Sequence, residues 1–121
     1  MLVSAQLTAC AGVRMRWVKL EDIQRFSPEK MVKAPLFETD RFFADIYCFE
    51  PGQAQKPHSH LDSDKVYVVC EGQGRFRVGD EECDLGAASA ILAPAGVEHG
   101  VVNRGPGRLV LLVFMAPKPK H

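Results

Sequence analysis

Residues 52–72 of this chain, GQAQKPHSHLDSDKVYVVCEG, carry the pattern from which its fold can be predicted and contain two of its four histidines, His58 and His60. On a β-strand, residues i and i+2 point to the same side about 6.5–7 Å apart, so these two imidazoles can converge on one ion. A second stretch, PAGVEHGVVN at residues 94–103, places His99 just after a turn signal, at the start of another expected strand. If that strand faces the first across a barrel, three neutral imidazoles meet. Such a set suits iron, zinc, manganese, nickel or copper.

Outward from these two stretches, apolar and polar residues alternate with a period of two. We predict strands at residues 41–50, 65–70, 75–78, 81–84, 90–93, 99–103 and 108–116. Glycine and proline turn signals separate them, and this spacing in one small domain is typical of an all-β sandwich or barrel. The last segment, RLVLLVFMA, is apolar on both faces, which predicts a central strand or a strand at a subunit interface.

The two ends of the chain carry weaker signals. The sequence MRWVKL from Met15 predicts a short strand, and Ser27 followed by proline predicts a helical turn over residues 27–30. We divide the chain into an N-terminal extension (1–14), for which Met15 is an alternative start, a barrel domain (15–116) and a tail (117–121). The tail, PKPKH, is expected to be loose because it cannot continue a sheet.

The composition excludes several classes of protein. The 121 residues include 15 Lys and Arg against 15 Asp and Glu, a net charge of zero, which argues against a nucleic-acid partner or an anionic membrane surface. No apolar run is long enough to cross a membrane. The four cysteines form no CxxC pair. We expect reduced thiols in a cytoplasmic protein, three of them packed as small hydrophobic side chains.

The two histidine stretches together resemble the two signature motifs of the cupin family. The first has a glycine, five residues, His-x-His, and a final glycine at the expected distance; the second fits PxGxxHxxxN at every fixed position. The resemblance implies a double-stranded β-helix of the jelly-roll type, commonly a homodimer. It also implies one divalent transition metal on His58, His60 and His99, a ligand set similar to that of cupin dioxygenases that use ferrous iron.

The sequence departs from the cupin motifs at two positions. Ala88 stands where the second motif usually has a glycine, so we expect that turn to be remodelled. Lys65 stands where the first motif usually has a metal-binding glutamate, and alternation places it on one face with Tyr67 and Val69, with Asp64 pointing away.

A lysine beside a dication must deprotonate, turn away or pair with an anion, and three interpretations of Lys65 remain open. In the first, Lys65 is a catalytic group that draws a substrate carboxylate or enolate onto the metal or moves a proton. In the second, it forms a structural ion pair at the barrel mouth and does nothing chemical; the candidate partners are Asp62, Asp64 or a bound anionic ligand. In the third, it abolishes metal binding and leaves a metal-free barrel.

Aromatic side chains from several predicted strands complete the candidate site. We expect a small, dry pocket shaped by four of them, Tyr47, Tyr67, Phe76 and Phe114. Glu98 is a candidate for orienting an imidazole, although alternation turns it away from His99. The leading functional hypothesis is a barrel that binds a metal and a small organic molecule, as a metal-dependent oxygenase or isomerase. The alternative is a non-catalytic sensor or accessory barrel, with or without metal; fold does not choose between them.

Overall fold

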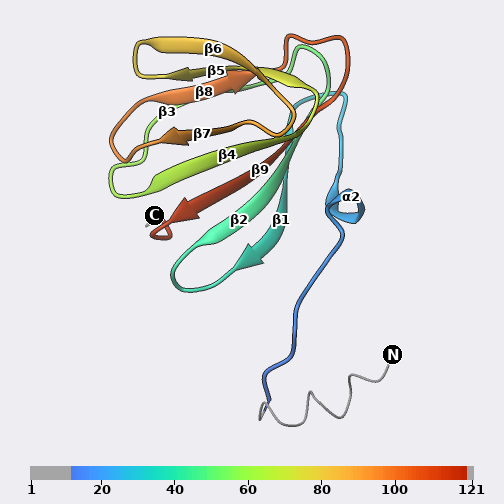
Figure 1. The fold of residues 1–121 in the computed structure, drawn as a ribbon, viewed down its shortest axis with the longest axis vertical. Coiled ribbons are helices and arrows are strands. Elements are labelled where there is room, and N and C mark those ends of the chain that lie inside the picture. Colours follow the sequence, from blue (N-terminus) through green and yellow to red (C-terminus); the bar gives the residue numbers. More distant parts are fainter. Residues whose placement is uncertain (1–11, 120–121) are drawn as a thin grey trace.

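The computed structural model describes residues 12–119 and consists of two antiparallel β-sheets packed face to face (Figure 1). One helical turn precedes nine strands: α2 (Leu20–Ile23), β1 (Val32–Glu38), β2 (Phe43–Phe49), β3 (Ala54–His58), β4 (Asp64–Glu71), β5 (Gln73–Val78), β6 (Glu81–Gly86), β7 (Ala90–Ala93), β8 (His99–Val102) and β9 (Leu109–Ala116). The first sheet has the order β1-β2-β9-β4-β7 and the second β3-β8-β5-β6. The all-β class and the jelly-roll barrel are therefore confirmed.

Strand β9 is central because both of its faces are apolar. Its inward residues, including Leu111 and Val113, join the core between the two sheets. Its outward residue Val110 joins a second cluster, where Ile23 and Phe26 from the N-terminal segment cover the outer face of β1, β2 and β9. The expectation of a central strand is confirmed, and the chain before β1 closes the side of the sheet that would otherwise meet water.

The N-terminal region differs from the expectation. No strand forms at Met15; the chain from residue 12 to α2 runs away from the barrel (Figure 1) and leaves Trp17 exposed. Residues 28–30 form a bend, and the Oγ of the preceding Ser27 accepts a hydrogen bond from the Glu29 amide. The helical turn lies earlier, in α2. Strand β1 was not predicted, because Pro35 interrupts its pattern. Proline is tolerated there since β1 is an edge strand with a bulge after Pro35.

The start of the C-terminal tail is held in place. The Ser63 hydroxyl donates to the Pro117 carbonyl at 2.7 Å, and the Lys118 amide donates to the Arg41 carbonyl at 3.0 Å. Lys118 also pairs with Glu38. The first residues of the tail therefore make defined contacts with the barrel, and residues 120–121 lie outside the described part.

The cysteines are only partly as expected. Cys48, Cys70 and Cys83 are free thiols, as predicted, but only Cys48 is buried. Cys10 lies outside the described residues, as does most of the N-terminal extension. Among residues 12–119, no helix has the length and apolar character needed to cross a membrane.

The turn at residues 87–89, before β7, contains a residue with a left-handed backbone although none of the three residues is glycine. Ala88 has φ of 70°, and its amide donates to the Val69 carbonyl at 2.8 Å. Ala88 thus adopts the left-handed backbone conformation that favours glycine. Because alanine carries a Cβ, this conformation is strained at Ala88.

Replacing Ala88 with glycine is expected to stabilise the protein. The left-handed conformation costs a non-glycine residue about 1–2 kcal/mol, while glycine loses about 0.5–1 kcal/mol more entropy on folding. The net gain is therefore about 0.5–1 kcal/mol, measured by urea unfolding. Ala87→Gly, one residue earlier, is the control and is expected to lose stability; equal effects at both positions would show that the strain at Ala88 is absent.

Candidate metal centre

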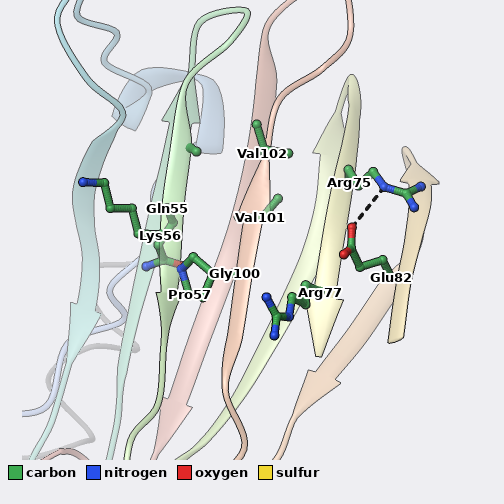
Figure 2. A pocket seen from close by; sticks show the side chains of 10 residues that line it. Gln55, Lys56, Pro57, Arg75, Arg77, Glu82, Gly100, Val101 and Val102 are labelled. Carbon is green, nitrogen blue, oxygen red and sulfur yellow. Dashed lines mark hydrogen bonds and ion pairs between the residues drawn. The ribbon is translucent and has the colours of Figure 1, made fainter. Parts of the chain in front are cut away.

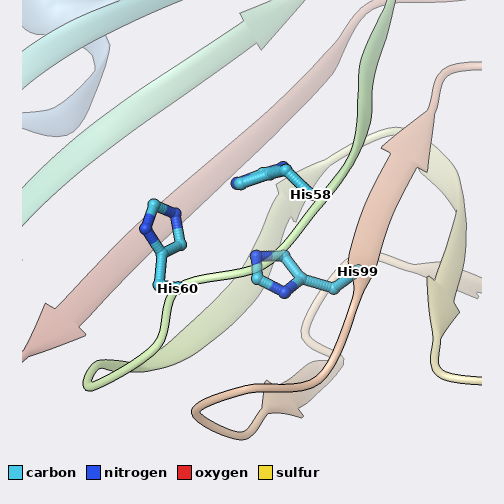
Figure 3. A group of neighbouring side chains, drawn as sticks. All are labelled: His58, His60 and His99. Carbon is cyan, nitrogen blue, oxygen red and sulfur yellow. The ribbon is translucent and has the colours of Figure 1, made fainter.

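The side chains of three histidines converge on one point (Figure 3). His58 is the last residue of β3 and His99 the first residue of β8, and the two are paired in register. His60 lies in the loop after β3. One ligand atom from each residue lies within 4.8 Å of the others, and the ring centroids are 4.5, 4.9 and 5.9 Å apart.

The geometry that brings the histidines together differs from the expected one. The strands of His58 and His99 are neighbours in one sheet rather than opposite walls of the barrel, and His60 is beyond the end of its strand. The backbone holds His60 instead, because its carbonyl accepts a hydrogen bond from the Gly96 amide at 2.8 Å. The turn that precedes His99 therefore also fixes His60.

Glycine at position 100 allows β3 and β8 to approach so closely. A Cβ at Gly100 would lie 2.9 Å from the Gln55 carbonyl oxygen and 3.0 Å from the Pro57 nitrogen, both backbone atoms. The register of β3 on β8 shifts between Gln55 and His58, which brings the backbone of β3 over Gly100. Any side chain at this position would push His58 away from His99.

Backbone carbonyls orient two of the three imidazoles. His58 Nδ1 lies 2.9 Å from the Lys56 carbonyl, and His99 Nδ1 lies 2.9 Å from the Val97 carbonyl. A carbonyl can only accept, so each Nδ1 carries the proton and each Nε2 presents its lone pair. A metal-binding histidine is usually oriented in this way. Glu98 takes no part in it: its carboxylate pairs with Arg77 at 3.2 Å, on the outer side.

The environment of His99 fits a metal ion. Its Nε2 is buried and is the one buried side-chain nitrogen or oxygen in residues 12–119 without a hydrogen-bond partner. Burial lowers the pKa of His99 to about 4, and the nearby charge of Lys65 acts in the same direction. Burial also lowers the pKa of His58. Both side chains are therefore neutral at physiological pH, the form that binds metals.

Lys65 lies inside the barrel, on the inward face that alternation predicts, with 1% of its surface exposed. Its Nζ donates to Gln55 Oε1 at 3.3 Å and lies 5.2 and 5.0 Å from the ring centroids of Tyr47 and Tyr67. Burial lowers the pKa of Lys65 to about 7, Lys33 acts in the same direction, and Asp45 partly opposes the shift.

The ion pair expected for Lys65 does not form in the described part of the chain. Asp64 points away, as predicted, and accepts a hydrogen bond from the Ala95 amide at 2.9 Å. No carboxylate of residues 12–119 pairs with Lys65. Of the three interpretations, the structural ion pair with Asp62 or Asp64 is therefore wrong.

Gln55 is a site residue that the sequence did not reveal. Its Oε1 accepts from the Tyr67 hydroxyl at 2.8 Å as well as from Lys65, and its Nε2 donates to the Tyr47 hydroxyl at 3.4 Å. Three buried polar side chains thus meet at one amide. No signal marked it, because the register shift after Gln55 breaks the alternation that would link it to His58.

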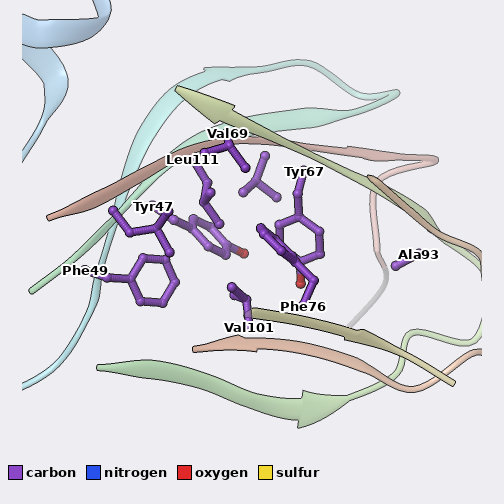
Figure 4. Packing of buried hydrophobic residues seen from close by; sticks show 10 residues of the cluster. Tyr47, Phe49, Tyr67, Val69, Phe76, Ala93, Val101 and Leu111 are labelled. Carbon is purple, nitrogen blue, oxygen red and sulfur yellow. The ribbon is translucent and has the colours of Figure 1, made fainter. Parts of the chain in front are cut away.

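Three of the four predicted pocket aromatics share one cluster (Figure 4). Tyr67 lies 6.5 Å from Tyr47 and 5.4 Å from Phe76 between ring centroids, and all three are buried. Phe114 does not join them. It is on the outward face of β9, 38% exposed and 5.1 Å from Phe42, because strand alternation separates it from the inward residues Val113 and Met115.

A separate hollow of about 260 Å³ lies on the outer side of the second sheet (Figure 2). Lys56, Arg75, Arg77 and Glu82 surround it. Arg75 pairs with Glu82 and Asp84, and Arg77 pairs with Glu98. The arginine charges are thus largely neutralised by these carboxylates.

The chain belongs to the cupin family, since it matches the Cupin domain over residues 45–115. A similar solved structure is TT1209 from Thermus thermophilus, with 47% identity and a TM-score of 0.84 over 87% of this chain and 100% of that one. A conserved protein of Klebsiella pneumoniae with a double-stranded β-helix domain has a TM-score of 0.80 at 23% identity, over 86% of this chain and 91% of that one.

A curated relative is the tetracenomycin polyketide synthase protein TcmJ of Streptomyces glaucescens, 36% identical over 73 residues. That match covers 58% of this chain and 49% of TcmJ, so it spans about half of the relative's length.

Proposed function

We propose that this cupin binds one divalent transition metal ion through a ring nitrogen of each of His58, His60 and His99. The observation that carries the proposal is the buried Nε2 of His99, which has no hydrogen-bond partner among the described residues and is beside the other two imidazoles. An all-nitrogen set of three neutral ligands suits iron, zinc, manganese, nickel or copper, and leaves positions for water and a small organic molecule.

The bound metal would supply a Lewis acid or an oxygen-binding centre for oxygenase or isomerase chemistry on the organic molecule. The chain's own contribution is the polar set at Gln55, Lys65 and Tyr67, which lies on the barrel interior close to His99. The similarity to TcmJ, whose name associates it with a polyketide synthase, supports an organic ligand.

One observation favours a second candidate, a metal-free ligand-binding barrel. The charge of Lys65 lowers the pKa of both His99 and His58, so it disfavours positive charge at the histidines. The same field opposes a dication unless Lys65 is neutral or an anion binds with the metal.

Elemental analysis of untagged protein purified without chelators tests the two candidates. We expect about one equivalent of a single transition metal in the wild type. The metal should be lost in His99→Ala and retained in Glu98→Gln, a substitution at the adjacent residue, which faces outward.

Adding that metal back to protein from which a chelator has removed it should raise the free energy of unfolding by about 4 kcal/mol when the metal is at a thousandfold excess over Kd. No metal in the wild type after anaerobic reconstitution would favour the metal-free barrel, and retention of metal by His99→Ala would show that the assigned site is wrong.

A further inference from the structure

Two lysines from different strands approach the ring of Tyr47. Gln55 links Tyr47 to Tyr67, whose ring centroid lies 6.2 Å from that of His99. Lys33 Nζ lies 5.3 Å and Lys65 Nζ 5.2 Å from the ring centroid of Tyr47. Lys33 is on β1, directly across from Tyr47 in the register of β1 on β2, and is exposed. Lys65 is on β4 and is buried. When Lys65 is protonated, the pair forms a line of positive charge from solvent to the barrel interior.

Carboxylates in the described part of the chain act on this lysine pair only at a distance. Neither lysine has an ion-pair partner in residues 12–119. Asp45, half-buried on β2, acts electrostatically on both Lys33 and Lys65 but forms an ion pair with neither of them. Both lysines also act on His58, so their positive field extends over the histidine centre.

The hydrogen-bonding groups around Lys65 are rich in donors. An ammonium group has three donors, of which Lys65 directs one to Gln55 Oε1. The Tyr47 hydroxyl accepts from Gln55 Nε2 and keeps its own O–H to donate. Gln55 Oε1, the acceptor here, already receives two donors. A ligand at this place must therefore supply acceptors, and an anion supplies the most favourable ones.

We infer that Lys33, Tyr47 and Lys65 form a binding site for a small organic carboxylate next to the three histidines. The carboxylate would take the unused donors of Lys65 and Tyr47, and its organic part would lie against apolar neighbours such as Val101 and Leu111. The inference deepens the proposed function by naming the class of the organic ligand. Anion binding itself requires only the lysines and the tyrosine, so it can be measured in the absence of metal.

Calorimetric titration of the chelator-treated protein with malonate tests the inference, with malonamide as a neutral ligand of the same shape. We expect malonate to bind and malonamide not to bind. Lys65→Met should weaken malonate at least about tenfold, since it removes a charged hydrogen bond. Lys33→Gln should weaken it about threefold because Lys33 is exposed. Lys30→Gln, an exposed lysine outside the site, is the control and should leave the affinity unchanged.

Three results would overturn the inference: unchanged malonate affinity in Lys65→Met, equal binding of malonamide, or binding of inorganic phosphate in place of malonate. Metal content, measured on the same Lys65→Met and Lys33→Gln preparations, separates the two proposals. If the protein binds malonate but never takes up metal, the metal centre is contradicted and the carboxylate site is supported. If it holds one equivalent of metal but does not bind malonate, the carboxylate site is contradicted and the metal centre is supported.

Discussion

Lys65→Met is expected to stabilise the metal-free protein by about 3 kcal/mol near pH 7 and by much less near pH 10. In the wild type, Lys65 is buried with a single hydrogen bond to a neutral amide, and burial lowers its pKa to about 7. The unfolded chain has an ordinary lysine pKa near 10.4. Methionine has a similar shape and no charge, and the Tyr67 hydroxyl still satisfies Gln55 Oε1 at 2.8 Å.

The sign of the pH dependence follows from proton binding. Between about pH 7 and 10.4 the unfolded chain holds the proton on Lys65 and the folded chain does not, so wild-type stability rises with pH. The slope from this group approaches about 1.4 kcal/mol per pH unit and adds up to about 3–4 kcal/mol by pH 10. Below about pH 7 the penalty of the buried charge is fully present.

Urea unfolding of the wild type and Lys65→Met at a series of pH values measures this difference directly. Lys30→Met, at an exposed site, should follow the wild-type curve at every pH. The proposed state of Lys65 is contradicted if Lys65→Met is less stable than the wild type near pH 7, or if the two proteins differ by the same amount at all pH values.

The position of Lys65 could be predicted from sequence because it needs only the period of a strand. The same local rule placed Asp64 outward and β9 in the centre of its sheet. The spacing of the two motifs also identified the three histidines that come together. Each of these predictions depends on residues within a few positions of one another or on a motif whose spacing is fixed.

The parts of the site that depend on strand pairing could not be predicted. Whether β3 and β8 are neighbours or opposite walls is a property of the topology, and the local pattern is the same in both cases. Gln55 contacts Lys65 and Tyr67, which are 10 and 12 residues away in the chain, across the interior between two sheets. Phe114 was assigned to the pocket because of its residue type, although its position on the strand turns it outward.

The two glycines of the first motif, Gly52 and Gly72, are expected to tolerate alanine very differently. Both have a left-handed backbone, with φ of 87° and 83°. A Cβ at Gly52 would meet nothing within 4 Å, whereas a Cβ at Gly72 would lie 2.1 Å from the Arg108 carbonyl oxygen. A second requirement therefore applies at Gly72. The residue must lack a Cβ so that the backbone leading into β9, the central strand of its sheet, can pass close to it.

Gly52→Ala is expected to cost about 1–2 kcal/mol of folding free energy, the usual penalty of the left-handed conformation. Gly72→Ala should cost about 4 kcal/mol, because displacing the Arg108 backbone adds an overpacking penalty to the same strain. That is a large part of the stability of a typical small domain, so Gly72→Ala is expected to unfold at much lower urea concentration or to accumulate unfolded.

Gly107 provides the matched control, since it has no left-handed φ and a Cβ added to it would meet no atom within 4 Å. Gly107→Ala should change stability by less than about 1 kcal/mol. Urea unfolding of the three variants separates the two requirements: Gly52→Ala minus Gly107→Ala gives the conformational strain, and Gly72→Ala minus Gly52→Ala gives the steric contact. Equal losses at Gly52 and Gly72 would mean that the backbone at Arg108 yields easily. The spacing from His60 to the final glycine of the motif would then not be set by the start of β9, and another contact would have to explain it.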